Sequence, residues 1–124
     1  MKIKVYIYGS KDKITFKNPS YSGGWVEIMV GLEDKYQGKY TAEQASRIVS
    51  GYFEGASLIG VTGLWKRKTE NAVMIRILNQ KAADFPKFRQ TSIRLARSLR
   101  KRFKQDSVIT TLYHPDGNVE NLFM

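Results

Sequence analysis

Cysteine is absent from the chain, and histidine occurs only once among its 124 residues. Without thiols the chain can form no disulfide, no thiolate metal site and no cysteine nucleophile. One histidine with scattered acids does not predict a transition-metal site either, so we expect no metal and no other cofactor. The lack of cysteine also fits a reducing compartment.

Long hydrophobic runs are missing as well. No segment approaches the ~20 apolar residues that cross a membrane as a helix. The N-terminal sequence MKIKVYIYGSKDK lacks the apolar run and small-residue cleavage site of a signal peptide. We therefore expect a cytoplasmic protein that is neither exported nor membrane-spanning.

The composition is that of an ordered protein. Hydrophobic residues make up 42% of the chain and aromatic residues 12%, with only three prolines. This apolar content is enough to offset the entropy of the chain, and the length fits a single domain of residues 1–124.

Most of the positive charge lies in one segment. The net charge is +10, and residues 85–105 contribute eight basic side chains and no acidic one. At ~100° per residue the segment predicts a helix. Its core face would carry Phe88, Ser92, Leu95, Ala96, Leu99 and Phe103.

Basic residues from this helix and from a second segment form the predicted ligand-binding surface. Arginine grips phosphate through two parallel hydrogen bonds, and an aromatic ring can stack on a base. The alternative interpretation is a solvated face that serves solubility. The predicted ligand-binding residues are Arg94, Arg97, Lys101, Lys104, Lys66, Arg67, Lys68 and Trp65.

The apolar periodicity predicts the order of elements from residue 25 onward. Thr41 and Gln44 form a capping-box pattern at the start of a helix. The order β-α-β-β-α-β predicts an α+β fold, the ferredoxin-like split βαβ arrangement with an antiparallel sheet. Expected strands are 25–32, 57–65, 72–78 and 107–113, expected helices are about 42–54 and 85–105, and 66–71 is expected to be a basic hairpin loop.

The two ends flank this core of residues 25–113. Residues 1–24 predict an added N-terminal β-hairpin, or an arm exchanged between subunits. The C-terminal tail, residues 114–124, could add a short strand or dock through Leu122 and Phe123.

Gly60 and Gly63 interrupt one expected strand. They predict a bulge or a close backbone approach. A phosphate-cradling loop is the less favoured interpretation, because no helix follows to lend its N-terminal amides.

One face of the sheet would be left without helices. Apolar side chains on an open face usually mark an interface, so we expect a homodimer or a higher homo-oligomer that closes it. Glu27 on the same face is expected to pair with Arg76 across the sheet. The predicted interface residues are Trp25, Met29, Met74 and Leu78.

No catalytic constellation stands out in the sequence. The carboxylates are not paired, and no Gly-x-Ser-x-Gly elbow is present. His114 precedes Pro-Asp-Gly and fits an exposed turn better than a general base. Glu70 has an ordinary ion-pair explanation in the nearby basic residues.

Two short motifs of the chain are Gly63, Trp65 and Glu70, then Phe103, Gln105, Ser107 and Val108. They resemble motifs of a family of small, functionally uncharacterised bacterial and phage proteins. In that family a Gly-x-Trp element precedes a glutamate, and a later helix runs into Phe-x-Gln-x-Ser-Val. The resemblance spans residues 25–113 and implies an α+β sandwich, but no reaction. Many family members look exported, and the arginine-rich helix is not part of the family pattern.

The leading functional prediction is a non-enzymatic protein that binds a phosphate-bearing ligand. That ligand would be a small nucleotide, such as a signal sequestered by a phage-type protein, or a nucleic-acid backbone. A second hypothesis is a protein-interaction module whose basic helix docks an acidic partner protein. A third is an enzyme that uses His114 or Glu70 on a phosphorylated substrate.

Overall fold

The computed structural model describes residues 23–79 and 84–124. The predicted N-terminal hairpin or arm therefore lies almost wholly outside the described residues. The described elements are β1 (Trp25–Gly31), α3 (Ala42–Ser50), β2 (Ser57–Trp65), β3 (Lys68–Leu78), α4 (Phe85–Arg102), β4 (Ile109–Tyr113) and β5 (Val119–Phe123).

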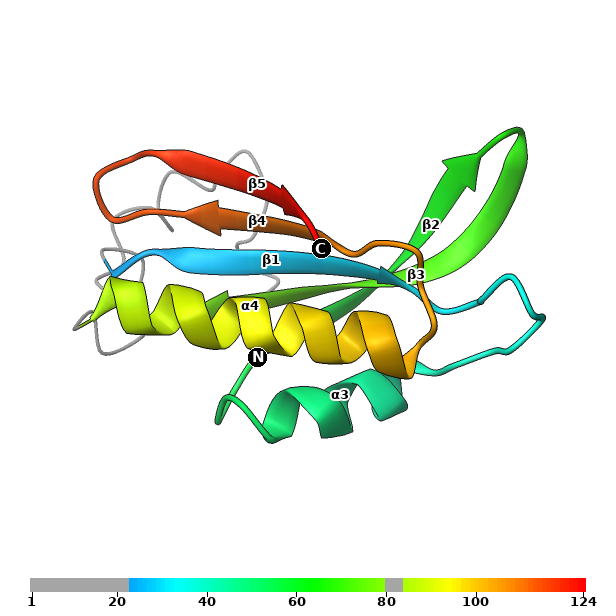
Figure 1. The fold of residues 1–124 in the computed structure, drawn as a ribbon, viewed down its shortest axis with the longest axis horizontal. Helices are drawn as coiled ribbons and strands as arrows, with labels where there is room; N and C mark the ends of the chain where they lie inside the picture. Colours follow the sequence, from blue (N-terminus) through cyan, green and yellow to red (C-terminus); the bar gives the residue numbers. More distant parts are fainter. Residues whose placement is uncertain (1–22, 80–83) are drawn as a thin grey trace.

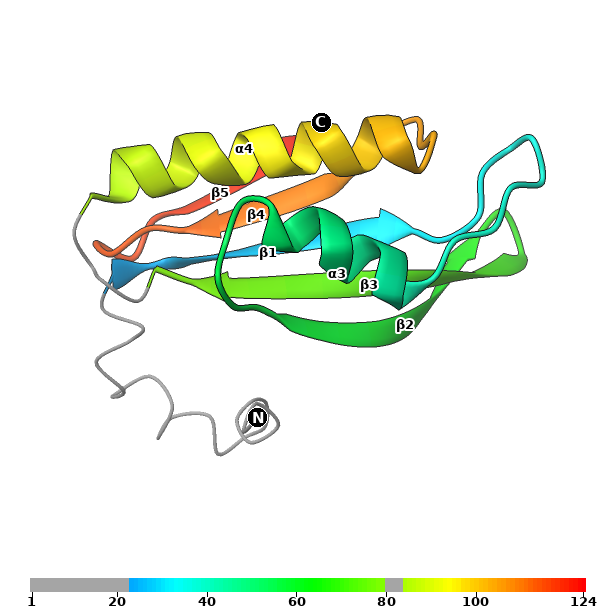
Figure 2. The ribbon, with the colours of Figure 1, turned by 90° about the horizontal axis from the view of Figure 1, so that it is seen from below.

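The strands form one antiparallel sheet in the order β2-β3-β1-β4-β5. Both helices lie on the same face of this sheet, with α4 running along its middle and α3 beside it (Figures 1 and 2). The prediction of an α+β fold with an antiparallel sheet is confirmed.

The core lies between the helices and the sheet. Every second residue of β1 is buried, because successive side chains of a strand point to opposite faces. Buried residues of β3 and β4 extend this inner surface, and Leu58 of β2 and Leu122 of β5 pack against it. The fully buried side chains include Val26, Ile28, Val30, Val73, Ile75, Leu95, Leu99 and Leu112.

Local sequence signals set the ends of both helices. Thr41 and Gln44 make the predicted capping box, each side chain satisfying the other's backbone amide. Asp84 caps α4 by accepting a hydrogen bond from the Lys87 amide, and Pro86 sits in the first turn, where no amide donor is needed. The predicted core face of α4 is confirmed, because all six of its residues are buried.

The connection between β2 and β3 differs from the prediction. The expected loop of residues 66–71 is a turn at Lys66 and Arg67, and β3 already begins at Lys68. Both turn residues have positive φ, 51° and 65°, as a two-residue hairpin turn requires. Asn-Gly usually occupies such turns. The Lys66-Arg67 pair is not a usual turn sequence, so the sequence does not predict a two-residue turn at this position.

The C-terminal tail adds a fifth strand. Residues Val119–Phe123 pair with β4 in antiparallel register, after a turn in which Gly117 has φ +96°. Of the two alternatives for the tail, an added strand is the one that the structure shows (Figure 1).

Leu95 and Leu64 provide a matched test of the core. Leu95 is fully buried, whereas Leu64 is 73% exposed near the β2–β3 turn. We expect Leu95→Ala to lower the free energy of unfolding by about 2–5 kcal/mol, because it leaves a cavity under α4. Leu64→Ala should cost less than about 1 kcal/mol in the same denaturant titration. Equal losses for the two variants would contradict this assignment of the core.

Candidate functional site

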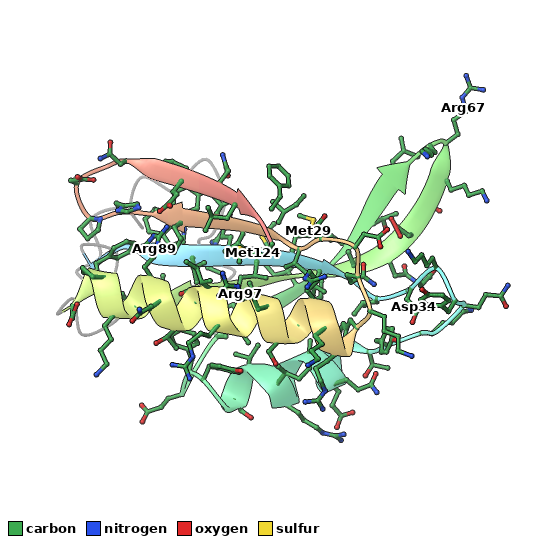
Figure 3. The ribbon with its side chains drawn as sticks, viewed as in Figure 1. Met29, Asp34, Arg67, Arg89, Arg97 and Met124 are labelled. Atoms are coloured by element: carbon green, nitrogen blue, oxygen red, sulfur yellow. The ribbon has the colours of Figure 1, made fainter. Side chains whose placement is uncertain are left out.

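The basic residues predicted to bind a ligand are exposed but lie in two separate places. Arg94, Arg97, Lys101 and Lys104 line the outer side of α4 and the residues just after it. Lys66, Arg67 and Lys68 lie at the β2–β3 turn, which follows Trp65, the last residue of β2. Figure 3 shows Arg67 at the tip of this hairpin, well apart from Arg97. The structure therefore does not gather the seven basic residues into one surface.

The face of the sheet away from the helices carries the predicted interface residues. Trp25, Met29, Met74 and Leu78 are all half-buried there, and Met29 lies directly opposite Met74. Whether a second copy covers this face stays a prediction. The predicted pairing on this face is confirmed, because the Arg76 guanidinium binds the Glu27 carboxylate at 2.7 Å.

An aromatic pair extends the same face toward β4. The rings of Trp25 and Tyr113 stack at 4.4 Å, and the Tyr113 hydroxyl donates to Glu27 at 3.3 Å. Burial raises the pKa of the Tyr113 hydroxyl, and the neighbouring Glu27 charge raises it further. The tyrosine therefore stays protonated and available as a donor across the neutral range.

His114 is held in a cluster with a structural role. Its Nε2 lies 2.9 Å from Oε1 of Glu120, and the Arg89 guanidinium binds both oxygens of the same carboxylate. The hydrogen bonds from Arg89 and then from His114 lower the pKa of Glu120 from 4.5 to about 2. The cluster joins the first half of α4 to the β4–β5 hairpin.

A concave surface occurs elsewhere, between the β2–β3 hairpin and the loop after β1. The hollow has a volume of about 420 Å³, within the range of pockets that hold small molecules. Figures 1 and 2 both show the loop after β1 beside the hairpin. Residues that line the hollow include Glu33, Lys39, Tyr40, Gly60, Thr62 and Asn71.

Gly60 leaves part of this hollow open. A Cβ atom built at Gly60 would meet no other atom within 4 Å. The predicted close approach of backbone at this position is therefore absent from the chain itself. The missing side chain instead makes room along β2 that a ligand could occupy.

One wall of the hollow is a short hairpin in which Asp34 is the main acceptor. Glu33 and Lys39 form an antiparallel bridge across it. The Asp34 carboxylate accepts hydrogen bonds from the Gly38 amide at 2.8 Å and from the Tyr40 hydroxyl at 2.5 Å. The Tyr40 bond is the largest cause that holds the pKa of Asp34 below its usual value, and the same bond raises the pKa of Tyr40.

The two motifs that resemble the family lie in different places. One is on the β2–β3 hairpin, and the other directly follows the C-terminal end of α4. Phe103 and Val108 are buried, Ser107 is exposed, and the Gln105 amide donates to the backbone oxygen of Glu33. Glu70 is half-buried and lies opposite Gly63 in the β2–β3 register. The resemblance itself stays a prediction.

The lining of the hollow is not predicted by the sequence pattern. The residues come from the loop after β1 and from two strands, and no spacing rule connects them. Gly60 was the available signal, because a glycine inside an apolar strand has no packing advantage.

Among the described residues, no group of three or more histidines and acids could hold a metal ion. None of the helices that the structure describes is long and apolar enough to cross a membrane.

Comparison with solved structures identifies similar enzymes. A phage SAM lyase in complex with S-methyl-5'-thioadenosine is 25% identical, with a TM-score of 0.68. The apo state of a phage SAM lyase is 28% identical, with a TM-score of 0.65. Each comparison covers 82% of this chain and 91% of the other. No protein-family model matches the chain, and no curated protein matches it.

This similarity overturns the functional prediction made from the sequence. Both structures are of an enzyme, and the bound thioadenosine carries no phosphate. The prediction of a non-enzymatic protein that binds nucleotides or nucleic acid through its basic residues is therefore wrong. The same finding replaces the predicted phosphate-bearing partner, and it gives no support to an acidic partner protein or a phosphorylated substrate. The error came from treating the location of charge as the location of a site.

The cluster around Glu120 predicts a pH-dependent contribution to stability. In the unfolded chain Glu120 takes up a proton near pH 4.5, whereas in the folded chain it stays ionised down to about pH 2. Its contribution is therefore present above pH 4.5 and is lost as the pH falls toward 2. We expect Glu120→Gln to lower the free energy of unfolding at pH 7 by about 1–2 kcal/mol.

The difference between the wild type and Glu120→Gln should shrink as denaturant titrations move from pH 4.5 to pH 2. Glu43→Gln is the control, because Glu43 forms an exposed pair with Arg47 one turn along α3. It should change stability by less than about 0.5 kcal/mol. A difference for Glu120→Gln that does not vary with pH would argue against the cluster.

Proposed function

We propose that this chain is an enzyme that cleaves S-adenosylmethionine and releases S-methyl-5'-thioadenosine. The observation that carries the proposal is the match of 82% of the chain to phage SAM lyase, with TM-scores of 0.65 and 0.68. At 25–28% identity the likeness extends beyond the general arrangement of helices and strands.

The proposed reaction breaks one bond of the substrate sulfonium. When the bond between sulfur and the aminobutyrate chain breaks, sulfur keeps the electron pair and becomes a neutral thioether. A lyase adds no water, so the carbon released from sulfur must form its new bond within the leaving fragment. The carboxylate of that fragment is the nucleophile at hand, and its attack closes a five-membered lactone. Atoms and charge then balance with no other reactant.

In this reaction the protein mainly has to bind and orient the substrate, and it has less need to supply reactive groups. The leaving group is neutral, so it needs no proton from an acid. The nucleophile belongs to the substrate and is already ionised at neutral pH. Holding the substrate folded, with its carboxylate behind the carbon, lowers the entropic part of the barrier.

We place the substrate in the hollow between the β2–β3 hairpin and the loop after β1. Its volume of about 420 Å³ is suitable for a small molecule of this size. The lining offers a carboxylate for the cationic part of the substrate at Glu33 and an ammonium for its carboxylate at Lys39. Thr62 and Asn71 add neutral hydrogen-bonding groups.

Two finer predictions from the sequence accompany this proposal. We propose a ferredoxin-like split βαβ core over residues 25–113, which the strand order β4-β1-β3-β2 within the larger sheet supports. A cytoplasmic location, expected from the composition, stays a prediction.

The direct test of the function is cleavage by the purified wild-type chain. We expect S-adenosylmethionine to be converted to S-methyl-5'-thioadenosine faster than in buffer alone, with one equivalent of homoserine lactone. Liquid chromatography with mass spectrometry measures both products. If the substrate decays at the same rate with and without the protein, the proposed function is wrong.

Gly60 and Gly55 provide a matched test of the location. A Cβ at either glycine would meet no atom within 4 Å, but only Gly60 lines the hollow. We expect Gly60→Leu to weaken binding of S-methyl-5'-thioadenosine by at least about tenfold in calorimetry, because the new side chain occupies the hollow. Gly55→Leu should bind like the wild type. If Gly60→Leu remains folded and binds normally, the ligand lies elsewhere.

A further inference from the structure

Several hydrogen bonds hold the loop after β1 in place, although its residues are exposed or half-buried. Its Asp34 carboxylate accepts from the amides of Tyr36 and Gly38 and from the Tyr40 hydroxyl. Gly38 fits closely against this group, since a Cβ there would lie 2.4 Å from an Asp34 oxygen. These contacts fix a turn that reverses the chain within a few residues.

Two further contacts tie this loop to the C-terminal end of α4. The Tyr40 ring stacks on Phe103 at 4.6 Å with an angle of 9° between the planes. The Gln105 amide donates to the backbone oxygens of Glu33, at 2.9 Å, and of Phe103, at 3.0 Å. Gln105 also fills the space beside Gly31, where a Cβ would meet its side-chain oxygen at 2.5 Å.

These contacts join the loop to the edge of the core, because Phe103 is one of its buried residues. Tyr40 is partly buried and packs against the core, whereas Asp34 and Gln105 are not among the core residues. The same contacts fix the position of Glu33, Lys39 and Tyr40, which line the hollow. A wall held before the ligand arrives loses less conformational entropy on binding.

We propose that Asp34 is a positioning residue for the ligand, and that it acts through Tyr40 and the loop of residues 33–40. This inference rests on the proposed function, because the ligand of the hollow is taken to be the substrate or product of the lyase reaction. Asp34 itself is not among the residues that line the hollow. Its effect must therefore pass through the geometry of the loop.

The polarity of the contact supports this role. The Tyr40 hydrogen bond is the main cause that keeps the pKa of Asp34 below its usual value, so the carboxylate is ionised at neutral pH. An ionised carboxylate makes stronger hydrogen bonds than a neutral acceptor. Asn at this position would still accept from the two backbone amides, whereas Ala would accept from none.

Asp34→Ala and Asp116→Ala form the decisive pair of variants. Both aspartates accept from a backbone amide two residues on, but Asp116 lies in the β4–β5 turn. We expect Asp34→Ala to raise the KM for S-adenosylmethionine and the Kd for S-methyl-5'-thioadenosine by about three- to tenfold, with kcat within about twofold. Asp116→Ala should leave all three values unchanged, and Asp34→Asn should recover most of the loss.

A second pair of variants isolates the hydroxyl group. Tyr40→Phe keeps the stack on Phe103 and removes the bond to Asp34, so its Kd should rise in the same direction by a smaller factor. Tyr36→Phe is its control in the same loop, because the Tyr36 side chain is exposed to solvent. Amide hydrogen exchange of residues 33–40 should become faster in Asp34→Ala and Tyr40→Phe, and should stay as in the wild type in both controls.

The outcomes separate the two proposals. If the wild type binds S-methyl-5'-thioadenosine and Asp34→Ala binds it equally well, this inference is overturned while the proposed function stands. The same holds if Asp34→Ala only lowers Tm and leaves binding per folded molecule unchanged. A wild-type chain that neither cleaves S-adenosylmethionine nor binds its product would overturn both.

Discussion

The packing of helix α4 against the sheet is the contact on which the rest of the structure depends. Its buried stripe, which runs from Phe88 to Leu99, covers the inner face of β1 and β4. The stripe continues past the helix into Phe103, on which the Tyr40 ring stacks. The residues that close the core at this end therefore also fix one wall of the hollow. A change that shifts α4 along the sheet must move that wall, so the stability of the core and the geometry of the site are coupled there.

The parts of this fold that are visible in the sequence are those decided by local burial. Alternating residues in β1 and the stripe of α4 each report a single buried face, and a strand or helix pattern follows directly from it. The turn at Lys66 and Arg67 gave no such signal, because its positive φ angles are imposed by the pairing of β2 with β3. Strand β5 was equally ambiguous, since its exposed residues gain their order from β4. The hollow is further removed from local sequence, because it exists only where the loop after β1 meets the hairpin.

The proposed chemistry explains why a search for catalytic motifs predicted a non-enzyme. Serine elbows, paired carboxylates and metal clusters belong to reactions in which the protein supplies a nucleophile, a proton or a Lewis acid. A sulfonium that is cleaved by a carboxylate of the same molecule needs none of these. In the proposed reaction the catalytic contribution is the shape and polarity of a pocket, which we propose is the hollow lined by residues such as Glu33, Thr62 and Asn71. Those residue types occur in every protein, and only their arrangement in space distinguishes them.

The net charge of +10 acts against binding of the proposed substrate. S-adenosylmethionine carries two positive groups and one negative group at neutral pH, so the field of a basic protein repels it. Salt limits this repulsion to charges within about 8 Å at physiological ionic strength. The hairpin tip with Arg67 and the outer face of α4 with Arg97 lie apart, and neither set lines the hollow. Near the hollow, the negative charges of Glu33 and the ionised Asp34 offset the positive charges of Lys39 and Lys104. The charge of Lys104 contributes to the lowered pKa of Asp34. At the proposed site, binding of a cation is therefore decided by these few local groups, and the basic segments that dominate the sequence carry little information about it.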